Sequence, residues 1–222
     1  NPSVVVVCGW ADPDYNKWIK NMDNNVVRVL MFDNYWEGSV RQVLGQLPLR
    51  LFLGLRYDFC WVPGEKHKGY AEKLGFAGQS CQLGMYATDL SPFHQDYERS
   101  LNAKAKDWPK KFLYAGRYLT LKGVEDLWQA FRHYRSKGGE WELHLAGAGE
   151  LWSERLEVDG MVHHGFLQQE DLRELASDCG VLIMPSHYDH WGMAVQELAA
   201  SGFPLILSNN VAAGTCFLQE NL

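Results

Sequence analysis

The sequence predicts an α/β protein in which parallel β-sheets are covered by helices. Short apolar runs rich in β-branched residues recur along the 222 residues, helical patterns lie between them, and the connections are short. Such an alternation is typical of parallel sheets, because each crossover between parallel strands needs a helix. With 46% hydrophobic residues, the chain can bury a core in one large unit or two small ones.

The first half of the chain contains four predicted strands. They are the runs SVVVV (3–7), VVRVLMF (26–32), YDFCWV (57–62) and SCQLGMY (80–86). Three helices are expected between them: one around Tyr15 and Ile19, one from Gly38 to Leu55 that Pro48 interrupts, and one over EKHKGYAEKLGF that Gly75 closes.

A polar and charged segment, ERSLNAKAKDWPKK (98–111), then separates two groups of elements. We therefore expect a domain boundary near Asp107, with an N-terminal domain over 1–107 and a C-terminal domain over 108–222.

The second half repeats the alternation of strands and helices. Helices are expected over 124–136, through Leu172 and Leu175, and from near Gly192 to Gly202. The predicted strands are KFLYAG (111–116), WELHLAG (141–147), MVHHGFL (161–167), VLIMPS (181–186) and PLILSN (204–209).

Composition excludes several classes of function. The net charge of −6 and the scattered basic residues argue against nucleic acid as a partner. No apolar run approaches the roughly 20 residues that span a bilayer, and the first residues lack a signal-peptide pattern. We expect a cytoplasmic protein whose five cysteines are reduced thiols of the core. The segment LRLFLGLR (49–56) leaves a weak membrane-surface association open, although a buried helix is the favoured interpretation.

Three loops of the second half carry candidate binding residues, because ligands of open parallel sheets bind beyond the carboxyl ends of the strands. Arg117 and Lys122 precede a helix and suit an anionic ligand, or else belong to a solvated loop. Gly147 and Gly149 follow a strand and permit a close backbone approach.

The third loop is the first part of the stretch PSHYDHWGMAVQELAASG (185–202), before the predicted helix that starts near Gly192. In this stretch Asp189 lies eight positions before Glu197. Two carboxylates beside free helix amides could bind sugar hydroxyls and phosphate. Alternatively, Asp189 caps the helix and Glu197 lies on a solvent face. His187 and His190 have no third ligand at metal-like spacing, so no metal site is expected.

These loops, YAGRYLTLKGV, LHLAGAGE and GFLQQEDLRELASDCGVLIMPSHYDHWGMAVQELAASGFPLILS, resemble the C-terminal domain of retaining glycosyltransferases of the GT-B fold (glycosyl transferases group 1, family 4-like). The resemblance covers about 109–210. The family's two-acid motif, Glu and a second Glu eight positions later, is present as Asp189 and Glu197. His190-Trp191-Gly192 stands where Pro-Phe-Gly is usual.

The N-terminal half is similar to the same family more loosely, over WVPGEKHKGYAEKLGFAGQSCQLGMYATDLSPF. Asp89 and Phe93 match the family pattern, whereas Tyr86-Ala87-Thr88 departs from the usual Asn-Gly-Val. By this comparison the chain is a fragment that lacks the start of the N-terminal domain and the end of the C-terminal domain.

The resemblance implies two Rossmann-like domains that face a cleft, the N-terminal one on the acceptor side and the C-terminal one binding the donor. It implies transfer of a sugar, with retention, from a nucleotide-diphosphate sugar to a glycan, a glycolipid or another acceptor, such as a lipid-linked one, in polysaccharide or glycoconjugate biosynthesis. No cofactor or metal is implied.

The resemblance also assigns roles to residues. Arg117 and Lys122 match the cations that hold the donor diphosphate, Asp189 the acid that contacts the transferred sugar, and Glu197 the acid that takes the ribose hydroxyls. The other expected donor-binding residues are Gly116, Phe166, Leu167, Gly192, Met193 and Ala194. Where the family often carries a catalytic His, this chain has Asp33 and Asn34, and Asp33 either orients a substrate or is a plain turn residue.

Two rival functions stay open from the sequence. One is a nucleotide-sugar epimerase on the same fold. The other is a non-catalytic relative that binds a sugar nucleotide or a carbohydrate, which the shorter Asp189 and the altered turn at Tyr86 make plausible.

Overall fold

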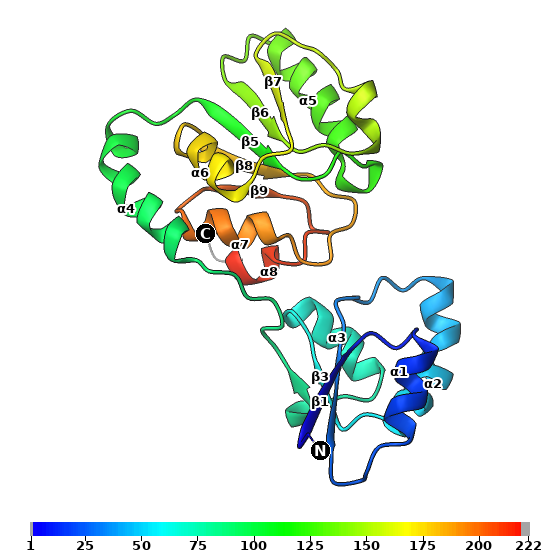
Figure 1. Ribbon diagram of the computed structural model, residues 1–222. Helices are drawn as coiled ribbons and strands as arrows, with labels where there is room; N and C mark the ends of the chain where they lie inside the picture. The colour runs from blue at the N-terminus through cyan, green and yellow to red at the C-terminus, as the bar shows by residue number, and fades with distance from the viewer. Residues whose placement is uncertain (1, 219–222) are drawn as a thin grey trace. The chain divides into compact units, whose positions relative to one another are not determined.

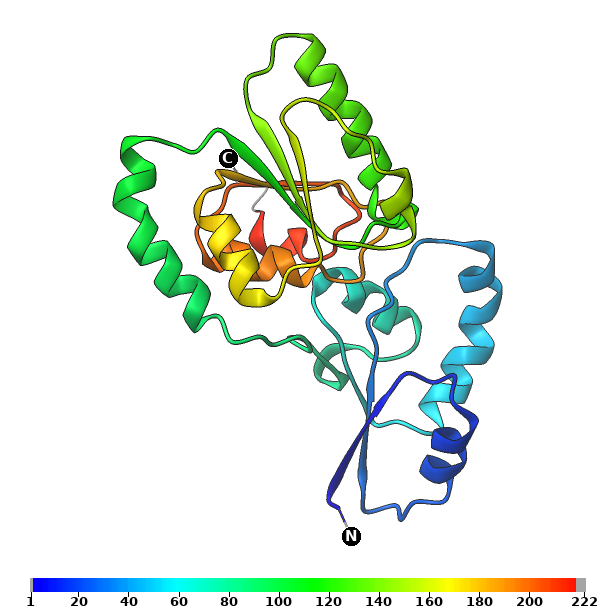
Figure 2. The same cartoon turned by 45° about the horizontal axis from the view of Figure 1, so that its top comes forward.

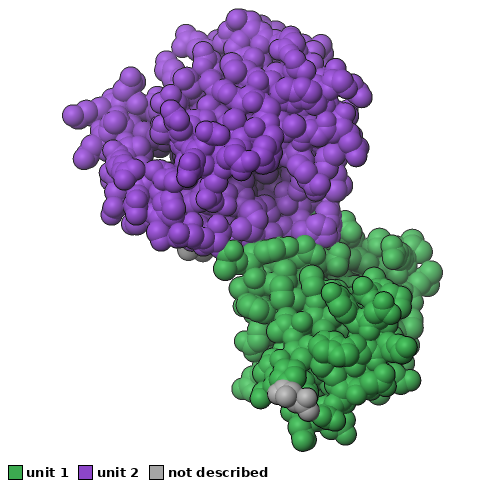
Figure 3. All heavy atoms as spheres, viewed as in Figure 1, with its two compact units in different colours: residues 1–87 green, residues 88–222 purple. Residues whose placement is uncertain are grey.

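A computed structural model describes residues 2–218. The chain forms two compact units, Asn1–Ala87 and Thr88–Leu222, shown in two colours in Figure 3. Each unit is built on one parallel sheet (Figure 1), so the predicted α/β class is confirmed.

The first unit contains a four-stranded sheet in the order β1-β2-β3-β4. The strands are β1 (Val4–Cys8), β2 (Val27–Met31), β3 (Phe59–Trp61) and β4 (Cys81–Gln82), all in parallel register. The helices are α1 (Pro13–Lys20), α2 (Val40–Gly54) and α3 (Glu65–Lys73), and a short 3-10 turn η1 (Gly78–Ser80) precedes β4.

One face of this sheet forms the core of the unit. Val5 and Val7 of β1 are buried in one cluster with Ile19 of α1, Leu53 of α2 and Tyr70 of α3. Three helices on the same face follow from a sequential strand order with right-handed crossovers. The alternate residues of β1, such as Val4 and Val6, are exposed.

Helix α2 runs through Pro48 without a break, so the predicted interruption was wrong. A proline inside a helix removes one hydrogen bond and usually kinks or ends the helix. Here Leu49 and Phe52 pack against the core and Leu53 is fully buried, and this tertiary packing on the C-terminal side of Pro48 outweighs the local penalty.

The unit boundary lies between Ala87 and Thr88 rather than near Asp107, because most of the charged segment belongs to a helix of the second unit that starts at Ser91. Helix α4 (Ser91–Lys106) buries Phe93 and packs against the helices α6 (Gln169–Ser177) and α7 (Met193–Ala200). Asp96 of α4 forms an ion pair with Arg173 of α6, with Nε and Oδ2 2.6 Å apart.

The second unit contains five parallel strands in the order β7-β6-β5-β8-β9. They are β5 (Lys111–Ala115), β6 (Glu142–Ala146), β7 (Met161–Gly165), β8 (Val181–Met184) and β9 (Leu205–Leu207). The chain leaves β5 toward β6 on one side and returns to β8 on the other. The order therefore reverses at β5, and such a switch point is where ligands of open α/β sheets bind.

Helices cover both faces of this sheet. Helix α5 (Val124–Ser136) lies on one face and α6 and α7 on the other (Figures 1 and 2). The remaining elements are η2 (Thr120–Lys122), η3 (Glu150–Glu154) and α8 (Gly214–Phe217).

The cysteines are only partly as expected. All five are free thiols, and Cys60, Cys81 and Cys179 are buried, but Cys8 and Cys216 are exposed. Cys8 is exposed because it points, like Val4 and Val6, to the uncovered face of the first sheet.

Candidate functional site

A pocket of about 200 Å³ lies at the carboxyl ends of β5, β6 and β7 in the second unit. Several expected donor-binding residues line it from three successive loops and from the first turn of α7. The lining consists of Ala115, Gly116, Arg117, Ala146, Gly147, Ala148, Phe166, Leu167, Leu172 and Ala194. The pocket therefore occupies the position that the strand order marks for a ligand.

Backbone hydrogen bonds lock the loops of this pocket together. The Gly116 amide donates to the Ala146 carbonyl at 3.0 Å, and the Gly147 amide donates to the Gly165 carbonyl at 2.7 Å. Gly147 has a φ of +151°, and a Cβ atom there would collide with the carbonyl oxygen of Gly116. Gly147 thus allows the loop after β6 to lie directly against the loop after β5, and both loops form the pocket.

Arg117 leaves β5 with its backbone fixed and its side chain exposed. The fully buried Tyr114 donates a hydrogen bond from its hydroxyl to the Arg117 carbonyl at 2.9 Å. Arg117 is one of the residues that line the pocket, and the forked donors of a guanidinium suit a phosphate or carboxylate.

Lys122 and Asp189 form a buried ion pair, with Nζ and Oδ2 2.8 Å apart and side chains only 16% and 8% exposed. The Ser186 hydroxyl also donates to Asp189 Oδ2, at 3.4 Å. The two loops that carry the pair touch at Gly123, whose φ of +66° and contact with the Pro185 carbonyl leave no room for a side chain. The carboxylate that was expected to contact the sugar thus holds the second expected cation.

Asp189 does not cap helix α7. The N-cap residue is Gly192, with a φ of +92°, and no side chain forms a cap hydrogen bond there. The backbone of Asp189 is instead tied to the segment after β9, since its amide donates to the Asn210 carbonyl at 3.1 Å. The start of α7, at Met193 and Ala194, therefore has no side-chain cap, and Ala194 lines the pocket.

Glu197 is half-buried rather than on a solvent face. Its Oε1 accepts hydrogen bonds from Thr88 Oγ1 at 3.4 Å and Gln169 Nε2 at 3.5 Å. Burial raises the pKa of this carboxyl, and the two hydrogen bonds oppose that rise. Sequence reasoning missed Thr88 and Gln169, because only the packing of α4 and α6 around α7 brings these segments to Glu197.

The histidines have partners other than a metal. His187 Nε2 lies 2.8 Å from Asp126 Oδ2, and His163 Nδ1 lies 2.8 Å from the Tyr118 hydroxyl. Within residues 2–218 no three His, Cys, Asp or Glu side chains come together as a metal-binding group.

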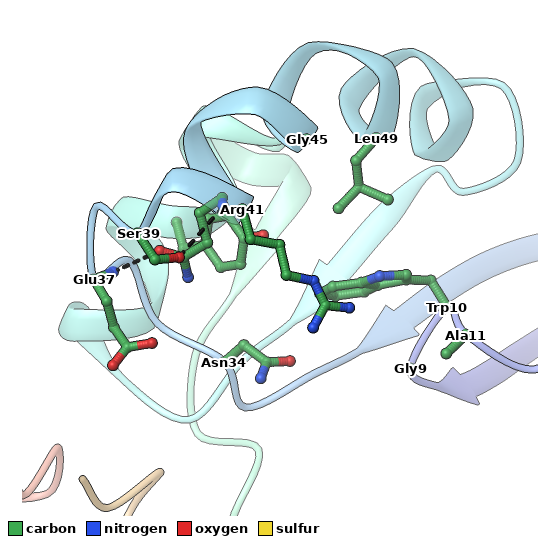
Figure 4. Close-up of a pocket in the computed structure, with 11 residues that line it drawn as sticks. Gly9, Trp10, Ala11, Asn34, Glu37, Ser39, Arg41, Gly45 and Leu49 are labelled. Atoms are coloured by element: carbon green, nitrogen blue, oxygen red, sulfur yellow. Dashed lines mark hydrogen bonds between the residues drawn. The ribbon is translucent and has the colours of Figure 1, made fainter.

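The first unit has a separate pocket of about 540 Å³ at the carboxyl ends of β1 and β2. Trp10 follows β1, Asn34 follows β2, and Glu37 and Arg41 come from the loop and first turn that open α2. Figure 4 shows the Arg41 side chain extending across the pocket toward Trp10, with Asn34 nearby. Asp33 is not among the residues that line this pocket; its Oδ2 accepts a hydrogen bond from the Tyr86 hydroxyl at 2.7 Å.

The family profile described as "Glycosyl transferases group 1" matches residues 96–216. The chain belongs to this family. Curated relatives agree: the chain is 30% identical over 109 residues to an uncharacterized glycosyltransferase, YqgM, of Bacillus subtilis, covering 46% of this chain and 30% of that protein. It is 31% identical over 112 residues to a glycogen synthase of Mycobacterium tuberculosis, covering 46% of this chain and 26% of that protein. The chain thus spans about a third or less of these relatives' length.

Solved structures show the same fold. Sucrose-phosphate synthase from Thermosynechococcus elongatus matches with a TM-score of 0.70 and 21% identity, over 96% of this chain and 57% of that one. TarM matches with a TM-score of 0.67 and 13% identity, over 98% of this chain and 43% of that one. HepE of Anabaena, solved in complex with UDP and glucose, matches with a TM-score of 0.60 and 13% identity, over 86% of this chain and 55% of that one. The GT-B type fold of this group 1 chain is therefore confirmed.

Proposed function

We propose that the protein transfers a sugar, with retention and without a metal ion, from a nucleotide-diphosphate sugar to a glycan, a glycolipid or another acceptor. The observation that carries this proposal is the pocket at the carboxyl ends of β5, β6 and β7, with exposed Arg117 on its wall. Its position and charge suit a nucleoside diphosphate. HepE, which has the same fold, was solved with UDP and glucose.

In this proposal the donor diphosphate lies between the Arg117 guanidinium and the uncapped first amides of α7 at Met193 and Ala194. Exposed Phe166 at the pocket rim and the backbone of Leu167 meet the base, and the Glu197 carboxylate accepts hydrogen bonds from the ribose hydroxyls. Positive charge at the leaving diphosphate stabilises the transition state of glycosyl transfer, so Arg117 and Lys122 do the work that a divalent cation does in other enzymes.

Asp189 has two roles in this proposal. It fixes the Lys122 ammonium 2.8 Å from its Oδ2, which keeps that cation at the switch point before the donor arrives. Its other carboxylate oxygen, Oδ1, is the atom that we assign to a hydroxyl of the transferred sugar. The shorter side chain of aspartate can serve both roles only if the sugar comes close to the loop after β8.

The acceptor is proposed to enter the pocket of the first unit. The Trp10 ring offers an apolar face to a sugar ring, while Asn34, Glu37 and Arg41 supply hydrogen-bond donors and acceptors (Figure 4). A cytoplasmic location, and a place in polysaccharide or glycoconjugate assembly, complete the proposal. Free thiols at all five cysteines support a reducing compartment.

The test is calorimetric titration of the complete protein with UDP, GDP, ADP and dTDP, with and without EDTA. We expect EDTA-insensitive binding of one nucleotide, weakened by about 10-fold to 100-fold in Arg117→Ala, as for a lost hydrogen bond to a charged group. Arg132→Ala, which removes an exposed arginine of α5, is the matched control and should bind like the wild type.

Failure of all four nucleotides to bind, or an equal loss in both arginine variants, would overturn the donor site. Activity is tested with the matching nucleotide sugar and added acceptors, and NMR of the product reports the anomeric configuration. Epimerisation of the donor without sugar transfer would favour the epimerase, and binding without turnover would favour a non-catalytic relative.

A further inference from the structure

The pocket of the first unit contains a positive charge that has no counter-charge of its own. Arg41 is exposed, and its side chain extends across the pocket toward Trp10 (Figure 4). Within residues 2–218 its guanidinium forms no ion pair and donates no hydrogen bond to a protein group. A guanidinium held over a pocket in this way is available to a ligand with a carboxylate or a phosphate.

The acidic residues beside the pocket have other partners. The Glu37 carboxylate points away from the Arg41 guanidinium (Figure 4). Burial lowers the pKa of Lys66, and the charge of Glu37 opposes that shift, so Glu37 acts on a different cation. Asp12, next to the lining residue Ala11, caps α1, and its Oδ1 accepts hydrogen bonds from two amides of that helix at 2.8 and 3.2 Å.

The start of α2 that carries Arg41 is held in place by one glutamine. Gln42 Oε1 accepts a hydrogen bond from the Glu37 amide at 2.9 Å, and its Nε2 donates to the Tyr35 carbonyl at 2.9 Å. Gly45 also lines the pocket, one turn further along the same face of α2, and the space beside it is open. The Arg41 side chain therefore starts from a fixed backbone and has room to lie across the pocket.

An aromatic ring lies beside this charge. Trp10 is half-buried and packs edge-on against Phe32 and Tyr70, with ring centroids 5.3 and 6.5 Å apart. The Asn16 side chain donates a hydrogen bond to the Trp10 carbonyl at 2.9 Å. A fixed indole of this kind offers a rigid apolar surface to the C–H face of a sugar ring.

We propose that the acceptor is an acidic sugar, whose oxyanion binds Arg41 while its ring packs on Trp10. The oxyanion is the carboxylate of a uronic acid or the phosphate of a sugar phosphate, because the forked donors of a guanidinium match both groups. A neutral sugar would displace water from the guanidinium without supplying a negative charge. The inference rests on the proposed transfer reaction, whose acceptor enters this pocket, and it names the class of that acceptor.

Arg50, the other arginine of α2, lies outside this pocket and lines a different one. It belongs to LRLFLGLR (49–56), for which the interpretation as a buried helix is only half right. Leu49 and Leu53 face the core, whereas Leu51 and Leu55 are exposed. None of the helices within residues 2–218 is long and apolar enough to cross a membrane.

The test is titration of the complete protein with glucuronic acid, glucose 6-phosphate, glucose and inorganic phosphate, followed by saturation-transfer NMR. We expect at least one acidic sugar to bind about tenfold more tightly than glucose, as for a hydrogen bond to a charged group, and this preference should shrink at high salt. Arg41→Gln should abolish the preference and leave glucose binding unchanged. Arg41→Lys keeps the charge without the fork and should retain part of it. Arg50→Gln is the matched control and should bind like the wild type.

The two acidic sugars separate the sources of the oxyanion, since tighter binding of one of them identifies a carboxylate or a phosphate. Equal affinity for glucose and both acidic sugars would overturn the proposal, as would an equal loss in both arginine variants. Free phosphate that binds as tightly as glucose 6-phosphate would also overturn it, by showing an anion site that does not recognise a sugar.

Circular dichroism and nucleotide titration show whether the variants are folded, because the expected nucleotide site lies in the second unit. Transfer to neutral acceptors with the same kcat/KM in the wild type and Arg41→Gln would overturn the acceptor class and leave the transfer reaction standing. A preference for acidic sugars that depends on Arg41, in a protein that binds no nucleotide, would support the acidic-sugar site and overturn the donor site alone.

Discussion

The ion pair between Lys122 and Asp189 can be tested by a double-mutant cycle. Asp189→Asn leaves a buried ammonium without a counter-charge, Lys122→Met leaves a buried carboxylate, and the double variant removes both charges. At 2.8 Å and an effective dielectric constant of about 20, the gross attraction is about 6 kcal/mol. Desolvation of the two groups offsets much of this, so we expect a net coupling of about 1.5–3 kcal/mol.

The assay is urea unfolding followed by circular dichroism for the wild type, both single variants and the double variant. Each single variant should lower the free energy of unfolding by about 3 kcal/mol, and the double variant by clearly less than the sum. The exposed pair of Lys110 and Glu140, 3.4 Å apart, is the control, and Lys110→Met with Glu140→Gln should show no measurable coupling. A coupling below about 0.5 kcal/mol for Lys122 and Asp189 would refute the claim that the carboxylate holds the ammonium.

Two further predictions concern stability. Burial raises the pKa of Glu197 above its usual 4.5, so the folded state binds more protons than the unfolded state between 4.5 and the raised pKa. The free energy of unfolding of the wild type should therefore fall as pH rises through that window, and the Glu197→Gln variant should not show this fall. The measurement is Tm as a function of pH for both proteins. Parallel curves for the two would contradict the burial of the Glu197 carboxylate. Gly147→Ala should lower the free energy of unfolding by several kcal/mol, because its Cβ would collide with the Gly116 carbonyl. Gly69→Ala, a helical position with open space, should be neutral or stabilising in the same urea titration.

The sequence predicted those parts of the fold that depend on local pattern. The helix over 124–136 was placed at its observed ends, because Val124, Leu127, Trp128 and Phe131 form one buried face. Of the nine strands within residues 2–218, eight fall inside predicted runs and β1 ends one residue beyond its run, since buried parallel strands are nearly continuous apolar segments. The topology then brings the loops after β5, β6 and β8 to one edge, as expected.

The rest depends on contacts between segments that are distant in sequence. Helix α4 resembles a linker in sequence because most of its residues are charged or small. Its place in the second unit follows from the burial of Phe93, the ion pair of Asp96 with Arg173, and the hydrogen bonds that Lys104 donates to the carbonyls of Ala176 and Cys179. Nothing local indicates that Lys122 would pair with Asp189, or that Thr88 and Gln169 would meet Glu197. The roles of these residues toward a donor stay predictions.

Pro48 bears on how helix α2 is stabilised. Because proline has no amide hydrogen, the carbonyl of Leu44 lacks the donor that a helix normally offers it. Leu44 lies on the exposed side of the helix, so water can donate to this carbonyl in place of the missing amide. The missing hydrogen bond therefore falls where solvent can replace it, and α2 continues through the proline from Val40 to Gly54.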